Sequence, residues 1–165
     1  MKNASQQIAK IGAGLIEGLG RLSGWMLFAL ILLQFAVVIA RYILSTNFLW
    51  AQELVIYLHA AIILFAISWA FLENKHVRLD ILSNTLGRKG RRVIEIFGTL
   101  FLLFPFSLVV LYYSKNYVWQ SWAVLEGSAE LSGLPGIFLV KTLILVFAIL
   151  LLIAGWLKLQ RRSPL

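Results

Sequence analysis

Four apolar segments alternate with polar ones along the chain, and each is long enough to cross a membrane. They run over Trp25–Leu44, Leu54–Leu72, Val93–Tyr113 and Leu134–Leu157, which are 19 to 24 residues long. A hydrocarbon core of ~30 Å needs about 20 helical residues, and only a helix satisfies every backbone group within such a segment. The pattern predicts an all-α integral membrane protein built as a four-helix bundle.

Residues 1–24 precede the first apolar run and have a different periodicity. Apolar side chains recur there at three- and four-residue steps, at Ile8, Ile11, Leu15, Leu19 and Leu22. This spacing is typical of an amphipathic helix that lies in the head-group plane, although the glycines of the segment weaken the helix prediction. We therefore expect a single membrane domain over residues 1–165, with an amphipathic arm ahead of the four spans.

The basic residues fall on one side of the predicted membrane. Twelve of the 15 Lys and Arg residues lie in the N-terminal arm, in the loop between spans two and three, or in the C-terminal tail. The positive-inside rule then places both termini and the middle loop in the cytoplasm, as expected for a multi-pass protein of a bacterial inner membrane. Contact of these loops with phospholipid head groups accounts for the net charge of +8, so no nucleic-acid partner is expected.

A few polar residues lie within or beside the predicted spans. Gln34 and Arg41 are about two helical turns apart on one face of span one, and this face should meet protein because charge is costly in a bilayer. Arg41 either reaches the outer head groups or pairs with Glu53, which opens span two on the same side. We expect the pair, which would join the first hairpin, with Lys141 as a competing partner of Glu53.

The two histidines do not indicate a cofactor. His59 lies inside span two, whereas His76 follows the inner end of that span, so they cannot face each other across one haem. The chain has no cysteine, and so few ligands are unsuited to a metal. We expect no cofactor, no metal site and no catalytic residues, and we interpret His59 as a packing residue. A membrane enzyme or redox subunit is correspondingly disfavoured.

Three short motifs follow one another in an informative order. They are Trp50 with Glu53 at the start of span two, His76, Arg78 and Asp80 just after it, and Gly133-Leu134-Pro135 before span four. Together with the length and the four-span layout, this order resembles the small membrane subunit of tripartite ATP-independent periplasmic (TRAP) transporters. On a short helix the Asp80 carboxylate could accept a hydrogen bond from His76, four residues away, and the alternative is a solvated basic loop.

The resemblance implies a sodium-coupled transporter of organic acids with two partners, a large multi-span membrane subunit and a periplasmic substrate-binding protein. The spans lack the paired Gly/Pro interruptions and midplane acid from which secondary transporters build their sites. We therefore expect a scaffold that anchors the large subunit. The outer loop, residues 114–133, would help to dock the binding protein, with Glu126 and Glu130 as candidate contacts.

Two other functions stay open at this point. A stand-alone small four-helix exporter typically carries an acid in its first span, where this chain has Arg41. A membrane assembly protein unrelated to transport differs from the scaffold interpretation only through the family motifs.

Overall fold

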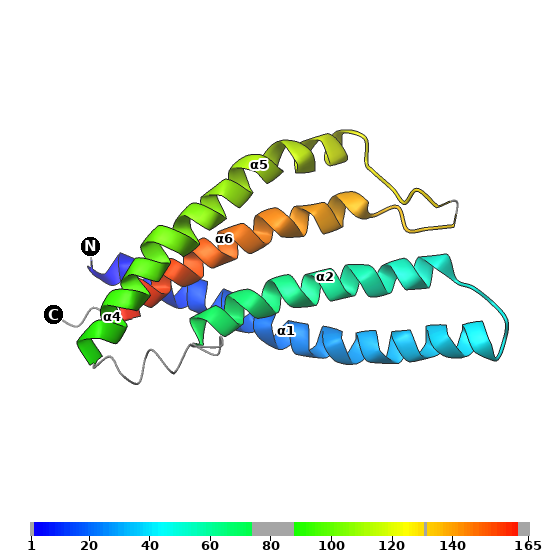
Figure 1. Ribbon diagram of the computed structural model, residues 1–165, viewed down its shortest axis with the longest axis horizontal. Helices are drawn as coiled ribbons and strands as arrows, with labels where there is room; N and C mark the ends of the chain where they lie inside the picture. Colours follow the sequence, from blue (N-terminus) through cyan, green and yellow to red (C-terminus); the bar gives the residue numbers. More distant parts are fainter. Residues whose placement is uncertain (1, 74–87, 131, 162–165) are drawn as a thin grey trace.

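The computed structural model describes residues 2–73, 88–130 and 132–161 (Figure 1). Its elements are the helices α1 (Lys2–Tyr42), α2 (Leu49–Leu72), α4 (Arg88–Phe97), α5 (Phe104–Ala123) and α6 (Ile137–Arg161), with the π-helix η1 (Gly98–Leu103) between α4 and α5. The described ranges contain helices and no strand. Within these ranges four helices are long and apolar enough to cross a membrane, the third of them running through α4, η1 and α5, which confirms the predicted all-α, four-helix membrane fold.

The four long helices follow the order α1, α2, α6, α5 across the molecule (Figure 1). α2 and α6 pack against each other, α1 packs on α2 and reaches α6, and α5 packs on α6. At the hairpin end, the first connection (residues 43–48) joins α1 to α2 and the second connection (residues 124–136) joins α5 to α6. At the opposite, terminal end α1 begins and α6 ends (Figure 1).

α1 is one continuous helix of 41 residues, without a break where the sequence separated arm from span. Ile16 is 1% exposed and belongs to a buried cluster. The other members come from α2 and α6 and are Leu72, Leu150, Ala154 and Leu157. Gly20 lies against Trp69 of α2, and a methyl group on it would come within 2.4 Å of the indole. Most of the predicted apolar stripe faces outward, with Ile8 and Ile11 exposed, whereas its member Leu19 packs against the buried cluster together with Ala9 and Ala13.

The third long helix differs from its predicted bounds and contains an irregular turn. It continues to Ala123, well past Tyr113, so the predicted outer loop over 114–133 was wrong and the connection covers 124–136 instead. Pro105 lies in the first turn of α5, just after the π-helix η1. A proline removes one backbone hydrogen bond and crowds the preceding turn, and the wider π-turn relieves that crowding.

Candidate functional site at the hairpin end

Glu53, in the second turn of α2, connects this helix to the second connection. One carboxylate oxygen accepts a hydrogen bond from the backbone N–H of Leu134 at 2.6 Å, and the other accepts one from the Ser128 hydroxyl. One turn further along α2, the Tyr57 hydroxyl donates to the carbonyl oxygen of Leu134 at 3.4 Å. Hydrogen bonds to an ionised carboxylate are stronger than neutral ones. α2 therefore holds both the N–H and the carbonyl of Leu134.

Ser128 extends this network within the second connection. Its hydroxyl oxygen accepts the backbone N–H of Glu130 at 3.0 Å, and its own N–H donates to the carbonyl of Leu134 at 3.1 Å. A methyl group on Gly133 would come within 2.2 Å of the Ser128 hydroxyl oxygen and 2.7 Å of the Glu53 carboxylate. Glycine is therefore required at Gly133 for the carboxylate to reach the backbone.

The structure thus joins two of the three sequence motifs, which lie about eighty residues apart. Glu53 comes from the first motif, and Leu134 comes from the Gly133-Leu134-Pro135 motif. Trp50, one turn before Glu53, is 46% exposed, and its ring lies 6.2 Å from that of Phe48. Trp50 therefore takes no part in the Glu53 network.

The predicted pair of Arg41 with Glu53 was wrong. The Arg41 guanidinium donates to the side-chain oxygen of Asn47 at 3.3 Å, and the Gln52 amide donates to the same oxygen. All three side chains belong to the exposed first connection and its flanks. Arg41 does not pair with Glu53 because its guanidinium is bound to Asn47 and because the Glu53 carboxylate is bound to the second connection.

Lys141 does not compete for Glu53 either. Its ammonium group forms an ion pair with Glu126 and lies 4.1 Å from the centre of the Tyr117 ring. Nearby, the Trp122 indole N–H donates to the Thr142 hydroxyl at 2.8 Å. The hydrogen bond from Lys141 lowers the pKa of the Glu126 carboxyl from its usual value. The second connection is therefore attached at a second place, to α5 and α6.

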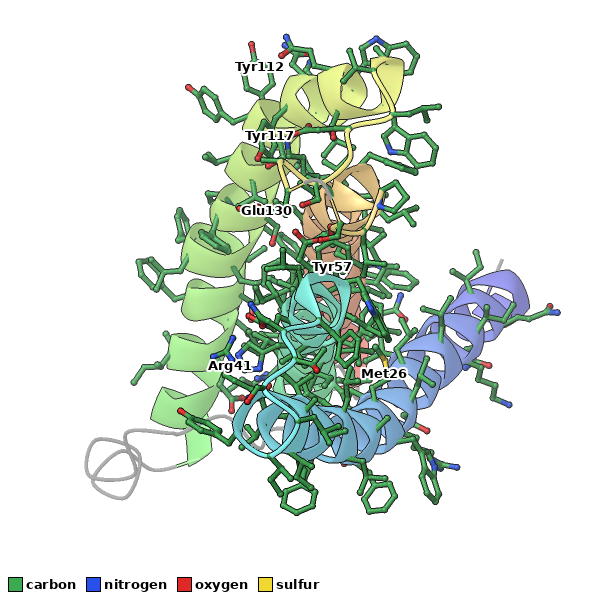
Figure 2. The ribbon with its side chains drawn as sticks, turned by 90° about the vertical axis from the view of Figure 1, so that its right-hand side faces the viewer. Met26, Arg41, Tyr57, Tyr112, Tyr117 and Glu130 are labelled. Carbon is green, nitrogen blue, oxygen red and sulfur yellow. The ribbon has the colours of Figure 1, made fainter. Side chains whose placement is uncertain are left out.

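The remaining predicted residues are placed as follows. Glu130 is an exposed residue of the second connection, and Figure 2 shows it at the hairpin end. Gln34 is exposed on α1. His59 is also exposed, so its interpretation as a packing residue was wrong. His76, Arg78 and Asp80 lie outside the described residues, and their predicted contact stays a prediction.

Comparison with known proteins identifies the family. Residues 30–155 match the family of tripartite ATP-independent periplasmic transporters, DctQ component. The chain belongs to this family. It is also 30% identical over 107 residues to a C4-dicarboxylate TRAP transporter small permease protein, DctQ, of Vibrio cholerae. That match covers 65% of this chain and 45% of the Vibrio protein. No solved structure matches the chain significantly.

Sequence reasoning missed three residues that build the site of this TRAP family member. Ser128 and Tyr57 complete the Glu53 network, and Tyr117 lies under Lys141. Tyr57 carried a signal, because it lies one turn after Glu53 on the same face of a helix. Ser128 carried none, because its contact depends on how the second connection folds back over α2. Tyr117 carried none, because its contact with Lys141 depends on how α5 packs along α6.

Proposed function

We propose that this chain is the small membrane subunit of a sodium-coupled, binding-protein-dependent TRAP transporter for organic acids. Family membership supports the subunit assignment, and the named C4-dicarboxylate specificity of the Vibrio relative makes dicarboxylates the first substrates to test. The basic residues near the terminal end support an orientation in a bacterial inner membrane with both termini in the cytoplasm.

The role that we propose within the transporter is that of a scaffold for the large membrane subunit. The observation that carries it is the continuity of the spans: α1, α2 and α6 run without interruption, and the irregular turn η1 contains no charged residue. Transporter sites are built from broken helices that offer free backbone groups and charges near the midplane. Continuous helices suit the part of a transporter that stays fixed while another part moves.

Reconstitution into liposomes tests this proposal. The large subunit is inserted with or without this chain, and uptake of a labelled C4-dicarboxylate is measured with the binding protein outside and an inward sodium gradient. We expect uptake with both subunits and little with the large subunit alone. Full-rate uptake by the large subunit alone would refute an essential scaffold role. Uptake or export by this chain alone would favour the stand-alone exporter.

We also propose that the second connection docks the periplasmic binding protein. Its first residues, directly after α5, are apolar and exposed, with Val124 72% and Leu125 64% exposed, and Leu125 takes a left-handed backbone conformation with φ of 43°. Glu130 adds an exposed acidic contact there, whereas Glu126 is engaged by Lys141. We expect Leu125→Asp and Glu130→Lys to raise the binding-protein concentration needed for half-maximal uptake without reducing assembly of the two membrane subunits. An unchanged concentration dependence in both variants would contradict docking at this connection.

A further inference from the structure

An apolar groove opens on one side of the molecule between α2 and α5. Its volume is about 480 Å³, and its main lining residues are Ile67, Phe71, Leu102, Phe106, Phe147 and Leu151. Phe106 is 54% exposed and Leu102 is 67% exposed, so the chain itself does not fill the groove. The groove lies within the membrane-spanning part of three helices.

A stripe along α2 continues from this groove toward the hairpin end. Ile56, His59, Ile63 and Ile67 follow at steps of three or four residues and therefore lie on one face of the helix. Ile56, His59 and Ile63 are exposed, and Ile67 lines the groove. His59 is ten residues past the start of α2, or about 15 Å along the helix, which places it in the middle of the span. No hydrogen bond joins it to any residue that the structure describes.

Gln34 lies at nearly the same depth on the neighbouring helix. It is eight residues before the end of α1, and His59 is ten residues after the start of α2, so they are at similar distances from the first connection. Both are exposed side chains with hydrogen-bonding groups. Two adjacent spans thus present polar groups at one level of the membrane.

Helix geometry turns these two side chains to the same side. On α1, Gln34 is offset by about 60° or more from the buried residues Val37 and Ala40. On α2, His59 is offset by about 80° from Trp69, which lies against Gly20 of α1. Both offsets have the same sense along the chain. Because the two helices are antiparallel and face each other, equal offsets point to one side of the pair.

That side is the side on which α5 lies. Arg41, two turns after Gln34 and on the same face of α1, is seen on that side in the view onto the hairpin end (Figure 2). We name this surface the recessed face and define it by Gln34, His59, Ile63 and the groove residue Phe106.

Lipid tails can fill the groove, but they cannot satisfy the hydrogen-bonding groups of Gln34 and His59 on the same face. They offer neither donors nor acceptors, and polar side chains within spans almost always face protein or a water-filled cavity. Within membranes, interhelical hydrogen bonds from Gln and His are a recurrent means of association. The occupant of the recessed face is therefore a protein segment with a hydrogen-bonding group at the depth of Gln34 and His59.

We propose that the recessed face binds a transmembrane helix of the large TRAP subunit, with Gln34 and His59 as its hydrogen-bonding contacts. This inference rests on the proposed function, which supplies that subunit as the partner. The helix fills the apolar groove beside Phe106 and presents a polar side chain or a free backbone group to His59.

Site-specific photo-crosslinking tests the surface. p-Benzoylphenylalanine is placed at Ile63 or Phe106 on the recessed face, and at Leu32 or Ile149 as controls. Leu32 is exposed and lies two residues before Gln34, and Ile149 is exposed and lies two residues after the groove residue Phe147. Residues two apart point about 160° away from each other around a helix, so both controls point away from the recessed face. In the co-purified complex we expect adducts with the large subunit from Ile63 and Phe106 and not from the controls.

The other outcomes separate the two proposals. If the two subunits do not co-purify, the proposed function fails. If they co-purify but Leu32 and Ile149 give the large-subunit adducts, or Ile63 and Phe106 react only with lipid or with a second copy of this chain, the recessed face is not the interface. Equal adduct yields from both sides also overturn the proposal.

Substitutions at the polar positions test the contacts themselves. His59→Leu and Gln34→Leu should each weaken assembly with the large subunit about three- to tenfold, the effect of one lost interhelical hydrogen bond. They should leave the unfolding temperature of the isolated chain unchanged or raised, because both side chains are exposed there. His59→Gln keeps a donor and an acceptor and should assemble normally. Normal assembly of both leucine variants contradicts the proposed contacts.

Discussion

The two ends of this molecule are held together by different interactions. At the terminal end, apolar packing holds the helices together: Gly20 lets α1 approach Trp69 closely, and Ile16 is buried in an apolar cluster with residues of α2 and α6. At the hairpin end, side chains hold a connection: Glu53 bonds to the backbone of Leu134, and Lys141 pairs with a second acid. Within a bilayer apolar surfaces alone give little drive to associate, so close packing dominates, whereas polar attachment suits a connection outside the spans.

The largest effect is expected from a methyl group at the terminal end. Gly20→Ala places a carbon within 2.4 Å of the Trp69 indole, so helix or side chain must shift. Overpacking of this kind costs about 1–3 kcal/mol. We expect a loss of that size in the free energy of unfolding, which denaturant unfolding in mixed micelles would measure. Gly18→Ala is the matched control, because nothing lies within 4 Å of a methyl group there. Equal losses in both variants would show that α1 does not pack on Trp69.

A somewhat smaller effect is expected from the charge at the hairpin end. Glu53→Gln removes an ionised acceptor from the Leu134 N–H and the Ser128 hydroxyl, and should cost about 1–2 kcal/mol in the same assay. Glu130→Gln is the control, because the Glu130 side chain is exposed and its backbone alone enters the network. If Glu130→Gln proves as costly as Glu53→Gln, general loss of charge and not the network is responsible.

A pH dependence tests the second attachment of the connection. The pKa of Glu126 is lowered by Lys141, so the ion pair contributes stability above the usual carboxylate range of about 4 and loses it as the pH falls through the lowered pKa. The unfolding temperature should therefore fall as the pH is lowered, and it should fall less when Lys141 is replaced by Met. The change should be smaller than that of Glu53→Gln, because Glu126 is more than a third exposed. An identical acid profile with Met at position 141 would contradict the pair.

The smallest effect is expected at the first connection. Arg41→Ala removes one exposed hydrogen bond to Asn47, and the unfolding free energy of the isolated chain should change by about 0.5 kcal/mol or less. A loss of unfolding free energy as large as that of Glu53→Gln would instead indicate that Arg41 pairs with Glu53.

The number and approximate position of the spans could be predicted from the sequence, because they depend on length and periodicity alone. Four apolar runs predict four spans because a bilayer of fixed thickness requires helices of that length. The sequence could not distinguish Gly20 from Gly18, because both are glycines in the same helix and only one lies against Trp69. It named Glu53 as a structural acid but paired it with the nearest cation. Its true partner, Leu134, is 81 residues away and offers a backbone N–H that no residue type reveals.

Whether Glu53 fixes the second connection to α2 can be tested by a distance measurement between the two connections. The chain has no cysteine, so spin labels can be attached at cysteines introduced at the exposed positions Thr46 and Leu125, one on each connection. Double electron–electron resonance then reports the distribution of distances between them. We predict one narrow distribution in the otherwise unaltered chain and a clearly broader one in Glu53→Gln. Equally narrow distributions in both proteins would show that Glu53 does not hold the second connection in place.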